Sequence, residues 1–141
     1  MEEYIIYNSE YHVLICRQHG YAIPPNGIVR HFRQLHKAIP LSTRQAIVQH
    51  IKSLDLYEPD KVVIPHDIIE PILHLTLLQG VKCQFDKCNE LRGTENSMVY
   101  HCKVAHQWIR TNGVLWSKQC IQTFFQSSNR RFVSIVVGIN C

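Results

Sequence analysis

Residues 83–106 read CQFDKCNELRGTENSMVYHCKVAH, and this stretch decides the fold. It holds two cysteines separated by four residues and, after twelve more, two histidines separated by four. Zinc takes four such ligands in a tetrahedron, and a short knuckle followed by a helix supplies them within one small unit. We therefore predict a C2H2-type zinc finger. Its ligands are Cys83, Cys88, His101 and His106.

A stretch with the same plan lies nearer the start of the chain. Residues 16–36 read CRQHGYAIPPNGIVRHFRQLH. Histidine stands here in place of the second knuckle cysteine, so a bound Zn²⁺ would keep a net positive charge, whereas a C2H2 site is neutral. We predict a second and weaker zinc site. Its ligands are Cys16, His19, His31 and His36.

Periodicity places each histidine pair on a helix. Ile28 and Met98 each stand three residues before the first histidine of a pair, as core residues of the same helix face would. We expect Asn26 to cap the first helix and either Thr94 or Asn96 to cap the second, and both histidines of each pair to share one helix face. Strands before the first helix are expected over residues 11–16 and 21–23.

The rest of the chain predicts one more helix and several strands. A helix should begin at Ser42 or Thr43, with Ser42 and Gln45 spaced as a capping box. Gln79 and Gly80 are typical of a turn before the second finger. Alternating or continuous apolar runs indicate strands towards the end of the chain. These strands are expected over residues 114–116, 121–125 and 132–137.

These elements predict an α+β fold, in which two ββα-like zinc fingers are integrated into one compact domain by a middle helix and C-terminal β-strands. Hydrophobic residues make up 45% of the 141 residues, which is enough for the core of a single domain. The predicted domain covers residues 1–141. Its parts are the first finger at 11–38, the helix and Pro-rich connector at 39–80, the second finger at 81–108 and the C-terminal strands at 109–141.

The cysteines fit metal binding better than disulfides. The chain has 6 cysteines and 9 histidines, and its first residues lack the apolar run of a signal peptide. Thiols stay reduced inside cells, so we expect an intracellular, nuclear protein with Cys102 buried as an apolar residue and Cys120 and Cys141 unpaired. A secreted disulfide protein is the weaker alternative. No stretch approaches the ~20 apolar residues of a membrane span.

The ligand sets argue against catalysis. Both clusters offer four protein ligands, whereas a catalytic zinc keeps one position open. The sequence has no H-E-x-x-H motif, no Gly-rich phosphate loop and no G-x-S-x-G elbow. We predict a non-catalytic binding module with two structural Zn²⁺ ions and no small-molecule substrate.

DNA or a chromatin protein is the partner class that zinc fingers suggest. The usual tandem reading of DNA is not favoured, because residues 37–82, 46 in all, separate the two clusters. The formal charge of +4 permits phosphate contact without requiring it. A protein-interaction or scaffold domain without nucleic-acid contact is the alternative. The residues expected to contact nucleic acid are Arg30, Arg33, Lys37 and Arg44.

The chain also resembles a known family. Beside both Cys/His clusters, the residues that carry the resemblance are Pro24, Pro25, Leu75, Gly80, Met98, Cys102, Trp116, the run Gln122-Thr123-Phe124-Phe125, and Phe132. Over residues 11–133 the chain is similar to the fungal domain of unknown function named after the orsellinic acid biosynthesis cluster protein D. The resemblance implies zinc binding and a nucleic-acid or chromatin setting, not a reaction. The sequence departs from the family pattern at His19, where cysteine is favoured, and its end at Cys141 suggests a fragment or a shortened paralogue.

Overall fold

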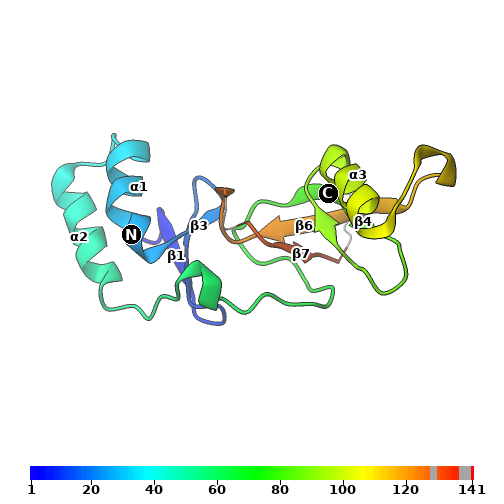
Figure 1. Cartoon of the computed structure of the whole chain (residues 1–141). Helices are drawn as coiled ribbons and strands as arrows, with labels where there is room; N and C mark the ends of the chain where they lie inside the picture. Colours follow the sequence, from blue (N-terminus) through cyan, green and yellow to red (C-terminus); the bar gives the residue numbers. More distant parts are fainter. Residues whose placement is uncertain (128–129, 137–140) are drawn as a thin grey trace. The chain divides into compact units, whose positions relative to one another are not determined.

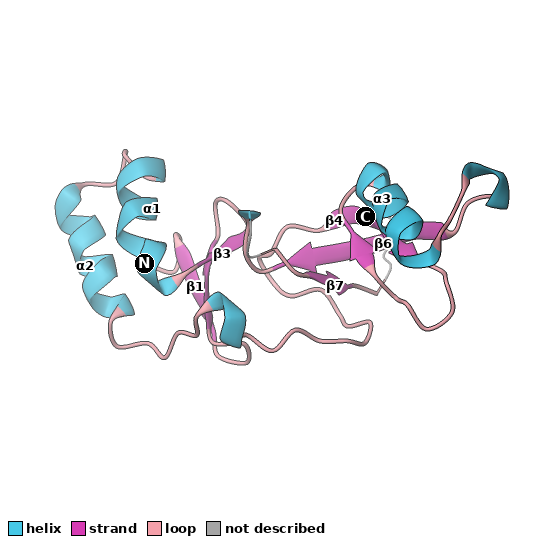
Figure 2. Ribbon diagram, in the orientation of Figure 1, coloured by secondary structure: helices cyan, strands magenta, loops and turns pink. Residues whose placement is uncertain are grey.

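The computed structural model describes residues 1–127, 130–136 and 141. Within them the chain forms three α-helices and two antiparallel sheets (Figures 1 and 2), so the predicted α+β class is confirmed. The residues group into two compact units, the first made of 1–63 with 124–130 and the second of 64–123 with 131–141. The single domain and its inner boundaries therefore stay a prediction. Among the helices described, none is both long and apolar enough to span a membrane.

A three-stranded sheet forms the base of the first unit. Its strands are β1 (Ile5–Asn8), β2 (Val13–Cys16) and β3 (Tyr21–Ile23), in the order β1-β2-β3. The central strand β2 is buried along its whole length and places Cys16 opposite Ile5 on one side and Tyr21 on the other. Strands β2 and β3 were expected from the sequence, whereas β1 was not. Its short apolar run has no alternation, so only pairing with β2 makes it a strand.

Two helices, α1 (Ile28–Leu35) and α2 (Leu41–Ile51), follow the first sheet and lie side by side (Figure 1). The predicted caps at Asn26 and Ser42 are both wrong. The N-caps are Gly27 and Pro40, and neither makes a side-chain capping bond. Pro40 has an extended backbone (φ −55°, ψ 147°), and it ends the preceding segment and sets the first helical residue without a polar cap.

The hydrophobic core of the first unit joins its sheet to both helices. Leu14 of β2, Phe32 of α1 and Ile47 of α2 are each at most 1% exposed. The thiol of Cys16 belongs to the same core, so one member of the first Cys/His cluster is packed among aliphatic side chains. The buried residues of this core are Ile5, Leu14, Cys16, Ile23, Ile28, Phe32, Ile39, Ile47 and Ile51.

The second unit contains a four-stranded antiparallel sheet in the order β5-β4-β6-β7 (Figure 2). Sequence patterns predicted two strands where β6 is continuous, because its first half is largely exposed and breaks the apolar alternation. The predicted strand end at Val137 lies outside the described residues. The strands are β4 (Leu78–Cys83), β5 (Leu91–Arg92), β6 (Trp116–Thr123) and β7 (Phe132–Ser134).

One buried side chain attaches the Pro-rich connector to this sheet. Gln122 of β6 is 1% exposed, and its Oε1 accepts from the backbone N–H of Ile72 at 2.8 Å. Its Nε2 donates to the carbonyls of Ile72 at 3.1 Å and Leu75 at 3.0 Å. These bonds satisfy the buried amide of Gln122. They also give hydrogen-bond partners to the backbone around Ile72 and Leu75, which belongs to no strand.

Helix α3 (Glu95–His106) contacts β4, and its buried face forms the second core. The predicted cap is confirmed, because Thr94 Oγ1 accepts from the backbone N–H of Ser97 at 3.1 Å. Cys102 is fully buried in this core, as expected of a small apolar residue. The buried residues of the second core are Cys83, Met98, Cys102 and Trp108.

Cys120 and Cys141 form a disulfide, so the prediction that they are unpaired is wrong. Their Cα atoms lie 5.6 Å apart although the two residues are 21 positions apart in sequence. That separation belongs to no motif, and only the tertiary fold brings the two residues together. This disulfide removes part of the support for a reducing compartment, although the other four cysteines are free thiols.

Gly80 lies inside β4, not in the turn predicted at residues 79 and 80. A Cβ on this residue would stand 2.7 Å from the carbonyl oxygen of Arg92 and would overlap the side chain of Ile121. Glycine is therefore required for the close approach of β4 to its neighbours on both sides.

We predict that Gly80→Ala lowers the free energy of unfolding by about 1–3 kcal/mol, because the methyl group must displace backbone or a packed side chain. Gly27→Ala is the matched control, since its Cβ would meet nothing closer than 3.9 Å. Thermal unfolding followed by circular dichroism measures both. Equal midpoints for the two variants would contradict the packing role of Gly80.

Candidate metal centres

The structure brings together the four residues of each Cys/His cluster. In each group, one ligand atom per residue lies within 4.8 Å of every other. The atoms are thiol sulfurs and imidazole nitrogens, which are ligands of transition metals. Each group can therefore hold a metal ion. The first group is Cys16, His19, His31 and His36, and the second is Cys83, Cys88, His101 and His106.

Donor atoms of the first group converge at short distances. Cys16 Sγ lies 3.2 Å from His19 Nδ1 and 3.3 Å from His36 Nε2, and His31 Nε2 lies 3.1 Å from His36 Nε2. Ligand atoms at the corners of a tetrahedron with zinc bond lengths would lie about 3.3–3.8 Å apart. The observed separations are close to this range, so the four side chains are arranged around one point.

A tight turn after β2 presents the first two residues of this group. Cys16 ends the strand, and the backbone N–H of Gly20 donates to its carbonyl at 2.8 Å. Gly20 has a positive φ of 75°, which glycine adopts without strain. The turn brings His19 back over Cys16, at the end of the strand nearest α1.

The sequence predicted that both histidines of the first pair share one helix face. This prediction is wrong, because His36 does not lie on the helix of His31. Residues five apart on an ideal helix point about 140° away from each other. Helix α1 ends at Leu35, and His36 leaves the helix with φ −125° and ψ 49°. In the second pair, both histidines lie within α3, with His106 as its last residue. The end of α1 before His36 therefore lets the second ring turn towards the first in the first pair only.

Burial favours the uncharged form of three donors of the first group before any ion binds. It lowers the pKa of His31 to about 4, with smaller contributions from His36 and His19. Burial also lowers the pKa of His36 and raises that of the Cys16 thiol. These two imidazoles and the thiol are thus favoured as neutral groups, and neutral imidazole is the form that binds a metal.

The second group contains a buried nitrogen without a partner. His106 Nε2 makes no hydrogen bond to any residue in the described part of the chain. Cys88 Sγ lies 3.2 Å from His101 Nε2, and the ring of His106 lies in the same cluster. A buried polar atom that is left unpaired is costly, and an ion at the centre of this group would satisfy it. The residues therefore fit a bound metal.

The loop between the two cysteines of the second group is held by its own backbone. The backbone N–H of Cys88 donates to the carbonyl oxygen of Phe85 at 3.0 Å, and that of Cys83 donates to the carbonyl oxygen of Glu90 at 2.8 Å. Lys87 and Asn89, on either side of Cys88, both have positive φ values (62° and 57°). The loop closes like a knuckle although it is longer than two residues.

Phe85 is a member of this site that the sequence reasoning missed. Its ring stacks on the imidazole of His106, with centroids 3.9 Å apart and planes inclined by 17°. The stack holds His106 in the orientation that directs Nε2 inward. An aromatic residue inside the Cys-x4-Cys loop was the available signal.

Cys102 lies beside the second group without belonging to it. Its thiol interacts with that of Cys83, and burial raises the pKa of Cys102 as it does that of Cys88. Burial likewise lowers the pKa of His101. Burial thus favours the neutral form of Cys88 and His101, two members of the second group.

The four basic residues expected to contact nucleic acid lie on or next to the first two helices. Arg30 and Arg33 are on α1, Lys37 follows it and Arg44 is on α2. Arg33 and Arg44 line one hollow together with apolar side chains, and Arg30 and Lys37 are exposed outside it. The four residues predicted to contact nucleic acid therefore do not form one surface: two line the hollow and two lie outside it.

Comparison with known proteins points to one family. Residues 3–107 match the family described as "Orsellinic acid/F9775 biosynthesis cluster protein D". The chain is 31% identical over 129 residues to the orsellinic acid/F9775 biosynthesis cluster protein D of Emericella nidulans. This match covers 92% of the chain and 25% of the relative, so the chain spans about a quarter of that protein. No solved structure matches the chain.

We predict that acidification destabilises the first unit between pH 6.5 and about 4. His31 is 7% exposed and its pKa falls from 6.5 to about 4, so the unfolded chain binds the extra proton in this window. The free energy of unfolding therefore decreases as the pH is lowered through this window, by up to about 3 kcal/mol. A bound ion would compete with the proton for the same nitrogen of His31. Acid would then still lower the free energy of unfolding.

Chemical denaturation at a series of pH values measures this slope. His31→Gln should flatten it, whereas Ile28→Val, which removes a methyl group from the same core, should lower stability and keep the slope. A wild-type slope in His31→Gln would contradict the assignment.

Proposed function

Because the chain belongs to the orsellinic acid/F9775 biosynthesis cluster protein D family and holds two convergent Cys/His groups, we propose that it is a non-catalytic binding module held together by two structural Zn²⁺ ions. The observation that carries the proposal is the second group. Its four donors converge, and the buried Nε2 of His106 has no partner among the described residues. An ion supplies the missing interaction.

Zinc is the metal that these donors favour. Two sulfur and two nitrogen ligands in a tetrahedron are typical of structural zinc sites. The first group has one sulfur and three nitrogens, a set that binds zinc with less charge neutralisation. We expect both groups to take Zn²⁺, the second more tightly than the first.

A structural role follows from where the ligands come from. In each unit, one ligand pair comes from a strand end and the turn after it, and the other from the end of a helix. An ion bound by both pairs would fasten helix to sheet, as in a ββα finger, and its binding energy would contribute to folding. Four protein ligands leave no open position for a substrate, which supports a non-catalytic module.

A protein is the partner class that the surface of the first unit supports best. Val29 and Leu41 are 57% and 59% exposed beside a hollow between α1 and α2. Apolar side chains gain from burial against another protein, whereas a phosphate backbone offers them nothing. Nucleic acid remains a second candidate because Arg30 and Lys37 are exposed. A nuclear location stays a prediction.

We predict that elemental analysis finds about two zinc ions per chain. Cys16→Ser and Cys83→Ser should each lose one ion, because each removes a ligand from a different unit. Cys102→Ala is the matched control and should keep both, since Cys102 lies in the second core outside the ligand set. His19→Ala should lower the occupancy of the first group.

Retention of both ions in Cys83→Ser, or metal-free wild-type protein purified without chelator, would contradict the proposal. Loss of zinc from Cys102→Ala would contradict the ligand assignment.

The second candidate, nucleic-acid binding, predicts a salt-dependent affinity for duplex DNA. Removing a positive charge that neutralises one phosphate should lower the slope of log affinity against log salt by about 0.9. The double variant Arg30→Gln, Lys37→Gln should therefore weaken binding and flatten the slope in a fluorescence anisotropy titration. An affinity that does not change between low and moderate salt would exclude this candidate.

A further inference from the structure

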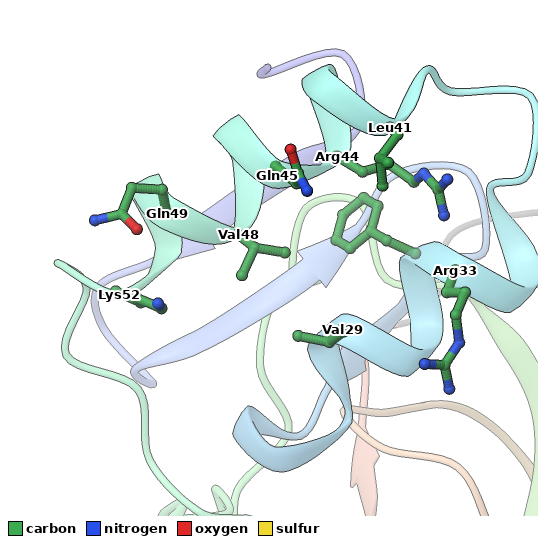
Figure 3. A pocket seen from close by; sticks show the side chains of 9 residues that line it. Val29, Arg33, Leu41, Arg44, Gln45, Val48, Gln49 and Lys52 are labelled. Atoms are coloured by element: carbon green, nitrogen blue, oxygen red, sulfur yellow. The ribbon is translucent and has the colours of Figure 1, made fainter.

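A hollow of 370 Å³ lies between α1 and α2 and belongs to neither Cys/His group. Most of its surface is apolar, although Gln45 and Gln49 of α2 also line it. Val29 projects from α1 and Val48 from α2 towards the space between the helices, and Leu41 stands at one end (Figure 3). Phe32 also lines it, although its side chain is only 1% exposed. The hollow is therefore an apolar trough whose outer walls are open to solvent.

The rim of this hollow is cationic. Arg33 and Arg44 lie at the same end as Leu41, and Lys52 lies at the other (Figure 3). None of the described residues that line the hollow is acidic, and neither arginine has an ion-pair partner within the described chain. The rim is thus complementary to negative charge.

Arg44 supplies a second sign of a missing ligand. Its Nε is buried and makes no hydrogen bond within the part of the chain that is described. A guanidinium N–H that is removed from water and left unpaired is costly, and a carboxylate is its best acceptor. The Arg44 side chain lines the hollow beside the apolar side chains, so one ligand can contact its guanidinium group and the apolar wall together.

A second hollow extends the first along the helix pair. It has a volume of 320 Å³ and shares Val29, Val48 and Lys52 with the first. Its remaining lining is mostly apolar and includes Leu54 and Leu56. The two hollows therefore form one groove, cationic at the Arg44 end and apolar at the other. A groove of this form suits an elongated chain segment better than a compact molecule.

We propose that this groove binds an acidic amphipathic helix of a partner protein. The helix lays leucine-like side chains on Val29 and Val48, and a carboxylate at one end pairs with the guanidinium of Arg44. Helix-in-groove recognition uses this combination of an apolar stripe and a charged end. The inference rests on the proposed function, since it names the partner of the zinc-held module.

The test uses the zinc-loaded chain and a fluorescein-labelled peptide of about four helical turns. The peptide carries leucine at positions i, i+3, i+4 and i+7 and glutamate elsewhere. We expect binding in the micromolar range at physiological salt. The same peptide with glutamine in place of glutamate should bind about tenfold more weakly.

Two variants locate the site. Arg44→Gln should weaken binding about tenfold, and Val29→Asp, at an exposed position that does not support the core, should abolish it. Arg30→Gln is the matched control, because Arg30 is an exposed arginine of α1 that does not line the groove. It should bind the peptide as the wild type does. Circular dichroism and zinc content confirm that each variant is folded.

Several outcomes would overturn the inference. They are no binding of the glutamate peptide, equal binding of the glutamine peptide, or equal losses in Arg44→Gln and Arg30→Gln. Displacement of the peptide by duplex DNA would assign the groove to nucleic acid instead. Zinc content is measured on the same sample, so failure of peptide binding with zinc retained overturns this inference alone, whereas absence of zinc overturns the proposed function.

Discussion

In each unit, four donor atoms from a strand end, the turn after it and a helix converge. Imidazole nitrogens are costly to bury unless something satisfies them. The side chains of His31 and His36 are nevertheless at most 7% exposed. Their Nε2 atoms lie 3.1 Å apart, and that of His36 lies 3.3 Å from the Cys16 thiol, so the burial of each group depends on the others. The convergence therefore ties the end of β2 to the segment of α1 in the first unit.

Small units need such a constraint more than large ones. The core cluster around Met98 and Trp108 in the second unit contains four buried residues and by itself buries little apolar surface. The buried Gln122 and the Cys120–Cys141 disulfide add ties between segments that are distant in sequence. A polar anchor and a covalent link thus supplement the apolar packing of this unit.

Local patterns could predict the ligand clusters because spacing is written directly in the sequence. The Thr94 cap and the buried Cys102 followed from the helix period in the same way. Non-local features could not be predicted. Strand β1 exists through its pairing with β2, and the close approach around Gly80 depends on two strands that are distant in sequence. The Cys120–Cys141 pair is of the same kind, since no motif relates two cysteines that meet only after the sheet has formed.

The first histidine pair departs from its predicted helix face for a geometric reason. Residues five apart on an ideal helix point about 140° away from each other, and α1 ends at Leu35, so His36 joins the cluster from outside the helix. The chain then turns through Pro40 and returns as α2, which contributes no residue to either Cys/His group. Only one side of α2, with Ile47 and Ile51, is needed for the core. The end of α1 at Leu35 thus allows a second helix to lie beside it with its other side outside the core.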